Sequence, residues 1–299
     1  MRATLIAVLT LACGACATTQ PAESVSQQPT APNAAATQSV ALVKIPTSAP
    51  QAGLVLGSVP PGSVLGYDGR AVRVGADGSF VVGVAREKTG TLSLKLTTPD
   101  GNTRTLDIAI VPRTFPIERV NGVDENSVNP PPAISVRIMR EQAEVDAVRT
   151  RDDDRADFAT AFTWPVKGRI SGVFGSQRIY NGTPASPHSG VDIAAAQGTP
   201  IHAPAGGIVT FANPDLYLTG GTVLIDHGHG ISSNLLHMSR IDVKVGDRVE
   251  QGQVIGLVGA TGHRVTGPHM HWGMNWFNVR VDPQLLMTPA GAQPATEAK

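Results

Sequence analysis

The chain has 299 residues and a formal net charge of zero, with 24 lysines and arginines against 24 aspartates and glutamates. A charge-balanced chain of this kind lacks the basic excess typical of nucleic-acid-binding proteins, so nucleic-acid binding is not expected. The 32 glycines and 23 prolines suit turns better than helices, which favours a β-rich fold.

Residues 1–17 predict a signal peptide. The apolar run over residues 3–12 is too short to span a bilayer but has the length of a signal-peptide core. Two processing routes are open: lipidation of Cys13 or Cys16, as in a bacterial lipoprotein, or ordinary cleavage after Ala17. Lipidation at Cys16 is the favoured route, and it would attach the protein to a membrane. These are the only two cysteines, so no disulfide is expected in the folded domains.

Residues 18–50 predict a disordered spacer. They consist mainly of threonine, glutamine, proline, alanine and serine. Such a composition cannot bury enough apolar surface to offset the conformational entropy lost on folding. The spacer would let a folded domain reach away from a membrane.

Residues 53–112 predict a small β-sandwich-like domain. Segments 72–74 and 92–96 alternate apolar and polar residues, as half-buried strands do. Asp-Gly pairs such as Asp68-Gly69 and Asp77-Gly78 are typical of hairpin turns. A wall-binding or partner-binding module, and a spacer that shields or positions the next domain, both remain open as interpretations. The absence of an aromatic cluster from this segment of the sequence weakens the first.

Residues 133–160 predict a linking helix. An apolar stripe recurs at helical spacing, and a run of three prolines directly before it prevents an earlier start. Glu141 interrupts the stripe, which is too short for a coiled coil. The helix is therefore expected to pack against the chain's own domains. The stripe consists of Ile134, Ile138, Val145 and Val148.

Residues 161–287 predict an antiparallel β domain with its functional site in a groove. Glycines separate short segments with strand character, and helix signals are nearly absent. The expected strands cover residues 207–211, 223–226, 231–236, 254–258 and 269–276. Residues 288–299 are expected to form a disordered tail.

All eight histidines lie between residues 188 and 271, whereas purely structural histidines would be spread along the chain. On a strand, His269 and His271 point the same way, about 7 Å apart. The even spacing from His188 to Asp192 places those two side chains on one face as well. Two imidazoles and a carboxylate that converge on one point would form a zinc site with an open fourth position. Such a site can activate water and polarise a carbonyl for hydrolysis.

A series of short motifs runs through the last part of the chain, at residues 174–178, 188–193, 198–201, 206–209, 225–228, 236–239, 245–247, 252–256, 261–262 and 267–271. In content and order these motifs resemble peptidase family M23, the lysostaphin- and LytM-like zinc metallopeptidases that cut peptide bridges in bacterial cell walls. The resemblance implies a LytM-like fold of the duplicated-hybrid-motif type and peptidoglycan peptide stems as substrate.

Carried over position by position, the resemblance implies that His188, Asp192 and His271 bind one zinc ion. It also implies that His237 and His269 assist catalysis, although which of the two is the base stays open. The remaining histidines are expected to be structural or to lie at the rim: His202, His227, His229 and His263.

One departure from the family pattern is Leu235, where a tyrosine is common. That tyrosine is interpreted as a packing residue, so the enzyme hypothesis stands. Tyr180 either supplies a phenol near the site or is a surface aromatic.

The favoured function is a zinc-dependent endopeptidase that hydrolyses peptide cross-links of peptidoglycan in the periplasm or cell envelope. Metal-bound water would be the nucleophile, with two histidines assisting. One alternative is a non-hydrolytic LytM-like scaffold that activates a cell-wall amidase, and another is a wall-binding protein with a vestigial site. All five site positions are present, which favours the enzyme. Nothing in 53–112 supplies a ligand or an acid–base group, so that domain is expected to be dispensable for the chemistry.

Overall fold

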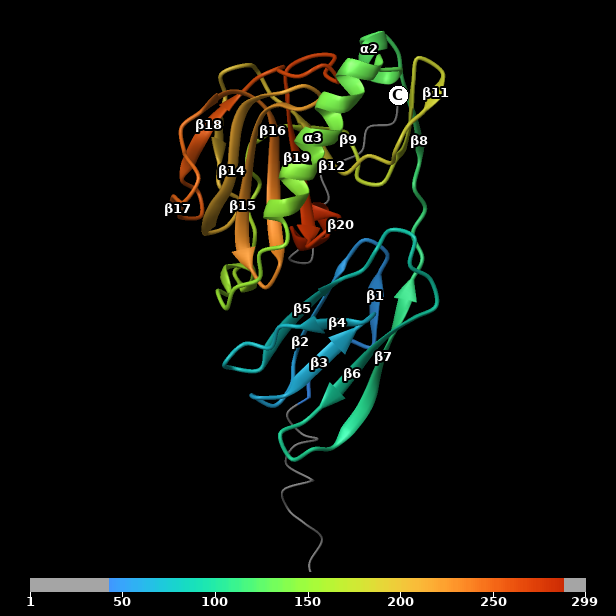
Figure 1. Ribbon diagram of the computed structural model, residues 1–299, viewed down its shortest axis with the longest axis vertical. Coiled ribbons are helices and arrows are strands. Elements are labelled where there is room, and N and C mark those ends of the chain that lie inside the picture. Colours follow the sequence, from blue (N-terminus) through green and yellow to red (C-terminus); the bar gives the residue numbers. More distant parts are fainter. Residues whose placement is uncertain (1–42, 288–299) are drawn as a thin grey trace, which may run out of the picture.

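The structure, a computed structural model, describes residues 43–287. The predicted signal peptide, most of the predicted spacer and the predicted tail lie outside the described residues. Within the described part, no helix is long and apolar enough to cross a membrane. The predicted fold class is confirmed: the chain is mostly β, with a small N-terminal β domain, a helix and a larger antiparallel β domain (Figure 1).

The N-terminal domain consists of two sheets that enclose a small apolar core. One sheet has the strand order β1-β7-β6-β3-β4, and the other pairs β2 with β5. The alternation predicted for residues 92–96 is present, because Leu92, Leu94 and Leu96 are all fully buried. The strands are β1 (Ser48–Pro50), β2 (Leu54–Ser58), β3 (Val64–Tyr67), β4 (Arg70–Val72), β5 (Ser79–Gly83), β6 (Thr91–Thr97) and β7 (Thr103–Val111).

The predicted spacer was extended too far, because ordered structure begins before residue 50. Strand β1 pairs in parallel with the end of β7, and Ala49 faces its partner Ile110. Ala49 is only 2% exposed. A short segment of small residues gains its order here from the free edge of β7, which supplies backbone hydrogen bonds that composition alone does not reveal.

The connection between the two domains contains β8 (Ile117–Val120), α2 (Glu125–Val128) and α3 (Pro132–Val148). The helix ends at Val148, so the predicted extension to residue 160 was wrong. Threonine and aspartate have low helix propensity, and three successive aspartates follow the helix end. Two of these aspartates bind arginines instead: Asp152 accepts from Arg73, and Asp153 accepts from Arg151 and Arg155.

Helix α3 lies across the strands of the larger domain (Figure 1), and Glu141 attaches it there. Glu141 interrupts the apolar stripe, yet it is the buried residue of the helix. One carboxylate oxygen accepts from the backbone N–H of Tyr217 at 2.8 Å, and the other accepts from Arg137 at 2.6 Å. Helix α3 therefore packs against the chain's own larger domain, as predicted. This packing depends on the Glu141 carboxylate as well as on the apolar stripe.

The larger domain contains a ten-stranded sheet whose main path is β17-β14-β15-β16-β19-β12-β9. All of its ladders are antiparallel. Its strands are β9 (Arg169–Gly172), β12 (Gly190–Ala194), β13 (Pro200–His202), β14 (Gly207–Leu216), β15 (Gly220–Gly228), β16 (Ile231–Ile241), β17 (Arg248–Val249), β18 (Val254–Val258), β19 (His269–Trp276) and β20 (Val279–Val281).

A small separate sheet joins the connection to the larger domain. It contains β8, β10 (Gln177–Tyr180) and β11 (Thr183–Pro184), with β8 parallel to β10. Two short 3₁₀ helices, η1 (Asp157–Ala159) and η2 (Pro283–Leu286), complete the described elements.

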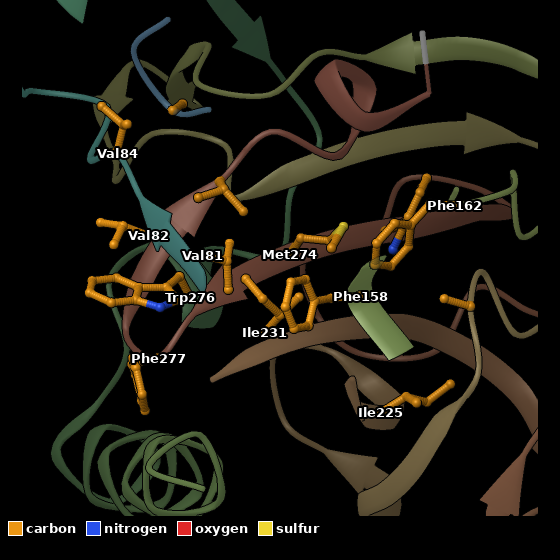
Figure 2. Close-up of a cluster of buried hydrophobic side chains, with 14 of the residues drawn as sticks. Val81, Val82, Val84, Phe158, Phe162, Ile225, Ile231, Met274, Trp276 and Phe277 are labelled. Atoms are coloured by element: carbon orange, nitrogen blue, oxygen red, sulfur yellow. The ribbon is translucent and has the colours of Figure 1, made fainter. Parts of the chain in front are cut away.

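The two domains share one hydrophobic core. Val81 and Val82 of β5 belong to the same buried cluster as Met274 and Trp276 of β19 (Figure 2). The approach is close: a Cβ added to Gly83 would lie 2.6 Å from the Cβ of Trp276. The N-terminal domain therefore covers one end of the sheet that carries the functional site.

Candidate metal centre

Two adjacent strands bring the predicted ligands together. Asp192 lies in the middle of β12, and its antiparallel partner on β19 is His271. His188 lies just before β12 and reaches back over the same face. Among the described residues, His188, Asp192 and His271 form the group that can hold a metal ion.

The three nearest ligand atoms form a compact triangle. His188 Nε2 is 3.0 Å from Asp192 Oδ1 and 3.0 Å from His271 Nδ1, and the third side measures 2.9 Å. Tetrahedral zinc with bonds of about 2.0–2.1 Å separates its ligand atoms by about 3.3 Å, which is close to this spacing. Neutral imidazole nitrogens and a carboxylate oxygen that converge in this way are lone-pair donors facing one point. The donor set therefore fits a cation, and its chemistry suits zinc.

Hydrogen bonding and glycines position these ligands. His188 Nδ1 donates to the carbonyl of Val173 at 3.0 Å, which leaves the lone pair on Nε2, toward the triangle. Gly190 makes room for His271, because a Cβ there would lie 2.7 Å from its Nε2. Bulk at this position would push the imidazole out of place.

Burial sets the ionisation of the site. Desolvation lowers the pKa of His271 to about 4, which keeps the ring neutral near pH 7. Burial alone would raise the pKa of Asp192, but hydrogen bonds and charge from His188 and His271 hold that pKa well below its ordinary value. Neutral imidazoles and an ionised carboxylate are the states that bind a metal.

The two histidines predicted to assist catalysis lie beside the triangle. The rings of His237 and His269 have centroids 4.8 Å apart, and His237 is 6.1 Å from His271 by the same measure. Each donates its Nδ1 proton to a backbone carbonyl, that of Thr261 or of Gly267. The Nε2 atom of each ring therefore carries the lone pair, and that of His269 is 3.6 Å from Asp192 Oδ1.

His237 occupies a demanding position. It is 6% exposed, and its backbone φ of 65° lies in the left-handed region that non-glycine residues rarely adopt. Burial, followed by the charges of His269 and His271, lowers its pKa to about 3. The side chain is thus held neutral and in one tautomer beside the three candidate metal ligands, an arrangement often found in functional sites.

All five residues open onto one cleft of about 1080 Å³. The larger domain supplies most of the lining residues. Upstream segments supply the others: residues 85–87 of the N-terminal domain, residues 118–120 of β8, and Gln142 of α3. The sequence did not predict that these segments would line the site.

The structure also shows where Tyr180, Leu235 and the histidines expected to be structural lie. Tyr180 lines the cleft, so the hypothesis of a phenol near the site is the one that the geometry supports. Leu235 is fully buried, as expected of a packing residue. His227 is buried and donates from Nδ1 to the carbonyl of Gly206, which is a structural role. His202 bonds the carbonyl of Gly252, and His263 lies 3.0 Å from Asp124.

Two residues near the metal centre received no role from the sequence. Arg178 donates to Oδ2 of Asp192 at 2.8 Å, and Glu118 of β8 lies 3.2 Å from Arg178. Arg178 belongs to a motif segment, so its position in the family pattern was a usable signal. No signal marked Glu118, because its place depends on a parallel pairing between distant segments.

Comparison with known proteins agrees with this geometry. Peptidase family M23 matches residues 186–283. A crystal structure from Pseudomonas aeruginosa, described as an M23 peptidase, is 32% identical to this chain with a TM-score of 0.63. That alignment covers 79% of this chain and 94% of the Pseudomonas chain.

The chain belongs to peptidase family M23.

The predicted family is therefore confirmed, and the peptidase class of the matching family agrees with the predicted class of enzyme. Two curated relatives from Vibrio cholerae are the peptidoglycan DD-endopeptidases ShyA, 43% identical over 112 residues, and ShyC, 36% identical over 132 residues. The alignments cover 36% and 44% of this chain, and they span only 26% and 30% of ShyA and ShyC. The similarity to these two proteins is thus confined to a part of each chain.

Proposed function

We propose that this M23 protein is a zinc-dependent endopeptidase that hydrolyses peptide cross-links of bacterial peptidoglycan. The observation that carries the proposal is the convergence of His188, Asp192 and His271 at the base of a large open cleft. The names of the Vibrio cholerae relatives support peptidoglycan as the substrate class.

The residues divide into a metal-binding set and a proton-transfer set. His188 Nε2, Asp192 Oδ1 and His271 Nδ1 would hold one zinc ion, which when bound supplies Lewis acidity and activates water. His237 and His269 are neutral acceptors at Nε2, since each Nδ1 proton is engaged by a carbonyl. One of them accepts the proton of the attacking water, and its protonated ring can then protonate the departing amine.

The upstream walls of the cleft suit a bulky substrate. A cleft of about 1080 Å³ lies just above the range of about 300–1,000 Å³ for small-molecule sites, which is consistent with a cross-linked peptide as substrate. The substrate would lie between the sheet of the larger domain and the segments 85–87 and 118–120.

Digestion of purified sacculi tests the proposed function. Mass spectrometry of the released fragments is expected to show cross-linked peptides converted to monomers with new amino and carboxyl ends, and chelation of the metal should abolish this conversion. Intact cross-links after incubation with zinc-loaded protein would contradict the proposal. The outcome would then favour a wall-binding or activating role.

The proposed location is the periplasm or cell envelope, with attachment to a membrane through lipidated Cys16. The apolar run over residues 3–12 and the cysteine that follows it support this proposal. A Cys16→Ser variant should leave the membrane fraction, whereas Cys13→Ser should remain there. Equal release of both variants would show that cleavage or lipidation occurs elsewhere.

A further inference from the structure

The second carboxylate oxygen of Asp192 is held by an arginine. Oδ1 of Asp192 belongs to the ligand triangle, while Oδ2 accepts a hydrogen bond from Arg178 Nη2 at 2.8 Å. The pair is largely buried, with side chains 10% and 13% exposed. Gly172 opposite Asp192 leaves the space for it, because a Cβ there would collide with Oδ2. Arg178 therefore fixes the rotation of the carboxylate that presents Oδ1 to a metal.

Arg178 is in turn held from outside the larger domain. In the parallel pairing of β8 with β10, Glu118 is the direct partner of Arg178. Its Oε2 lies 3.2 Å from Arg178 Nε as an ion pair, and its side chain is 25% exposed. Both residues lie outside 186–283, the segment that matches the family.

The charges explain why an additional carboxylate is useful here. A guanidinium beside a cation site repels the cation, although it orients the ligand. Glu118 offsets that positive charge and leaves the orienting hydrogen bond in place. Without Glu118, the positive charge of Arg178 would no longer be offset and its side chain would lose an anchor, and both effects weaken metal binding.

We propose that Glu118, in the strand that connects the two domains, is a positioning residue of the metal centre that acts on Asp192 through Arg178. The chain Glu118–Arg178–Asp192 makes the upstream strand β8 part of the site rather than a passive connection. The proposal rests on the proposed function only in requiring that His188, Asp192 and His271 bind zinc.

The test is zinc affinity of the full chain, measured by competition with a chromophoric chelator, alongside thermal unfolding of the metal-free protein. Arg178→Met is expected to weaken zinc binding about 10- to 100-fold, the usual effect of losing a group that orients a ligand. Glu118→Gln, which keeps the size of the side chain, is expected to weaken binding several-fold. In the Arg178→Met background, Glu118→Gln should add little, because the two act in series.

Arg113→Gln is the matched control. Arg113 also lies in the connection and pairs with the larger domain, at 2.6 Å from Asp282, but Asp282 is not one of the three proposed ligands. This variant should retain wild-type zinc affinity. The proposal is overturned if Glu118→Gln binds zinc as wild type does, if its effect is the same with and without Arg178, or if Arg113→Gln loses as much affinity.

Turnover on sacculi separates this proposal from the proposed function. A wild-type protein that binds zinc but leaves cross-links intact would overturn the proposed endopeptidase function. The positioning role of Glu118 would still be tested by the zinc affinities of the variants. A wild-type protein with full turnover and a Glu118→Gln variant with unchanged zinc affinity would overturn only the positioning role.

Discussion

At the scale of single residues, burial decides what each histidine can do. His237 and His271 lose the charged form because the interior cannot solvate it, so both present lone pairs near pH 7. Backbone carbonyls then select the tautomer, as Thr261 does for His237. His227 is buried as well, but both of its ring nitrogens have partners within the fold, so its role is structural.

The sequence was informative about residues whose spacing reflects local geometry. His269 and His271 share a face because a strand alternates, and Asp192 meets His271 because two such strands pair. Glu118 could not be found in this way. Its partner is far along the chain, and β8 is short with Ile117 exposed, so no apolar alternation marked the strand.

His237→Ala should separate proton transfer from metal binding. The variant is expected to retain zinc and to lose about 10²–10⁴-fold in turnover, because it removes a positioned acid–base group. Elemental analysis and the rate of cross-link cleavage check the two parts. His202→Ala is the control, since the His202 ring bonds the Gly252 carbonyl and does not line the cleft. A near-wild-type rate for His237→Ala would remove that residue from the proposed mechanism.

The burial of His227 predicts that the protein loses stability in mild acid. Burial lowers its pKa to about 4 in the folded chain, against about 6.5 when unfolded. The unfolded state therefore binds the proton first, and stability falls as the pH drops from about 6.5 toward 4. At pH 5 this loss is about 2 kcal/mol. Urea unfolding of metal-free protein at pH 7 and pH 5 measures it. His227→Asn should be less stable at pH 7 but show a smaller pH dependence, and an unchanged dependence would assign the effect to other groups.

At the scale of elements, α3 shows how a polar contact can determine packing. The apolar stripe predicted the helix and its packing against the chain's own domain, but not the buried role of Glu141. The helix end was also missed, because the aspartates after Val148 pair with arginines from several segments. The five strands predicted for the larger domain are all present, and β18 and β19 have the predicted bounds, but the sheet has ten strands and β14, β15 and β16 are longer than predicted. Local patterns therefore predicted element types better than the ends that tertiary contacts determine.

Glu141→Ala tests the attachment of α3. The change leaves the backbone N–H of Tyr217 without its carboxylate acceptor, and it should destabilise the protein by about 1–3 kcal/mol. Amide exchange in residues 132–148 should become faster. Glu144→Ala is the matched control, because Glu144 is one turn away and its ion pair with Arg140 is exposed. Equal effects of the two changes would mean that general helix propensity, rather than the buried carboxylate, is responsible.

At the scale of the whole molecule, the two domains form one packed unit. Val81 and Val82 bury the same core as Trp276 (Figure 2), and Arg113 reaches the buried carboxylate of Asp282. Upstream segments contribute to the lining of the cleft. The N-terminal domain was expected to be dispensable for the chemistry because it supplies no ligand. The shared core and the ion pair of Glu118 with Arg178 give a physical reason to expect otherwise. The larger domain should depend on the upstream residues for its stability and for metal binding.

Removal of the residues before Ala159 tests this dependence. The shortened chain loses the partners of Trp276 and the ion pair of Arg178. It should melt at a lower temperature than the full chain, bind a hydrophobic dye and hold zinc less tightly. Calorimetry of the full chain should show a single transition. Two separate transitions, or a truncated protein as stable as the full chain, would show that the domains fold independently.

The central claim is that His188, Asp192 and His271 form one zinc site. The measurement that tests it most directly is the metal content per chain of the metal-replete, dialysed full-length protein, compared with Asp192→Ala prepared in the same way. One zinc per wild-type chain and little or none in the variant are expected, since removing a ligand breaks a site with only three protein ligands. A wild-type protein without zinc, or an Asp192→Ala protein with a full equivalent, would contradict it.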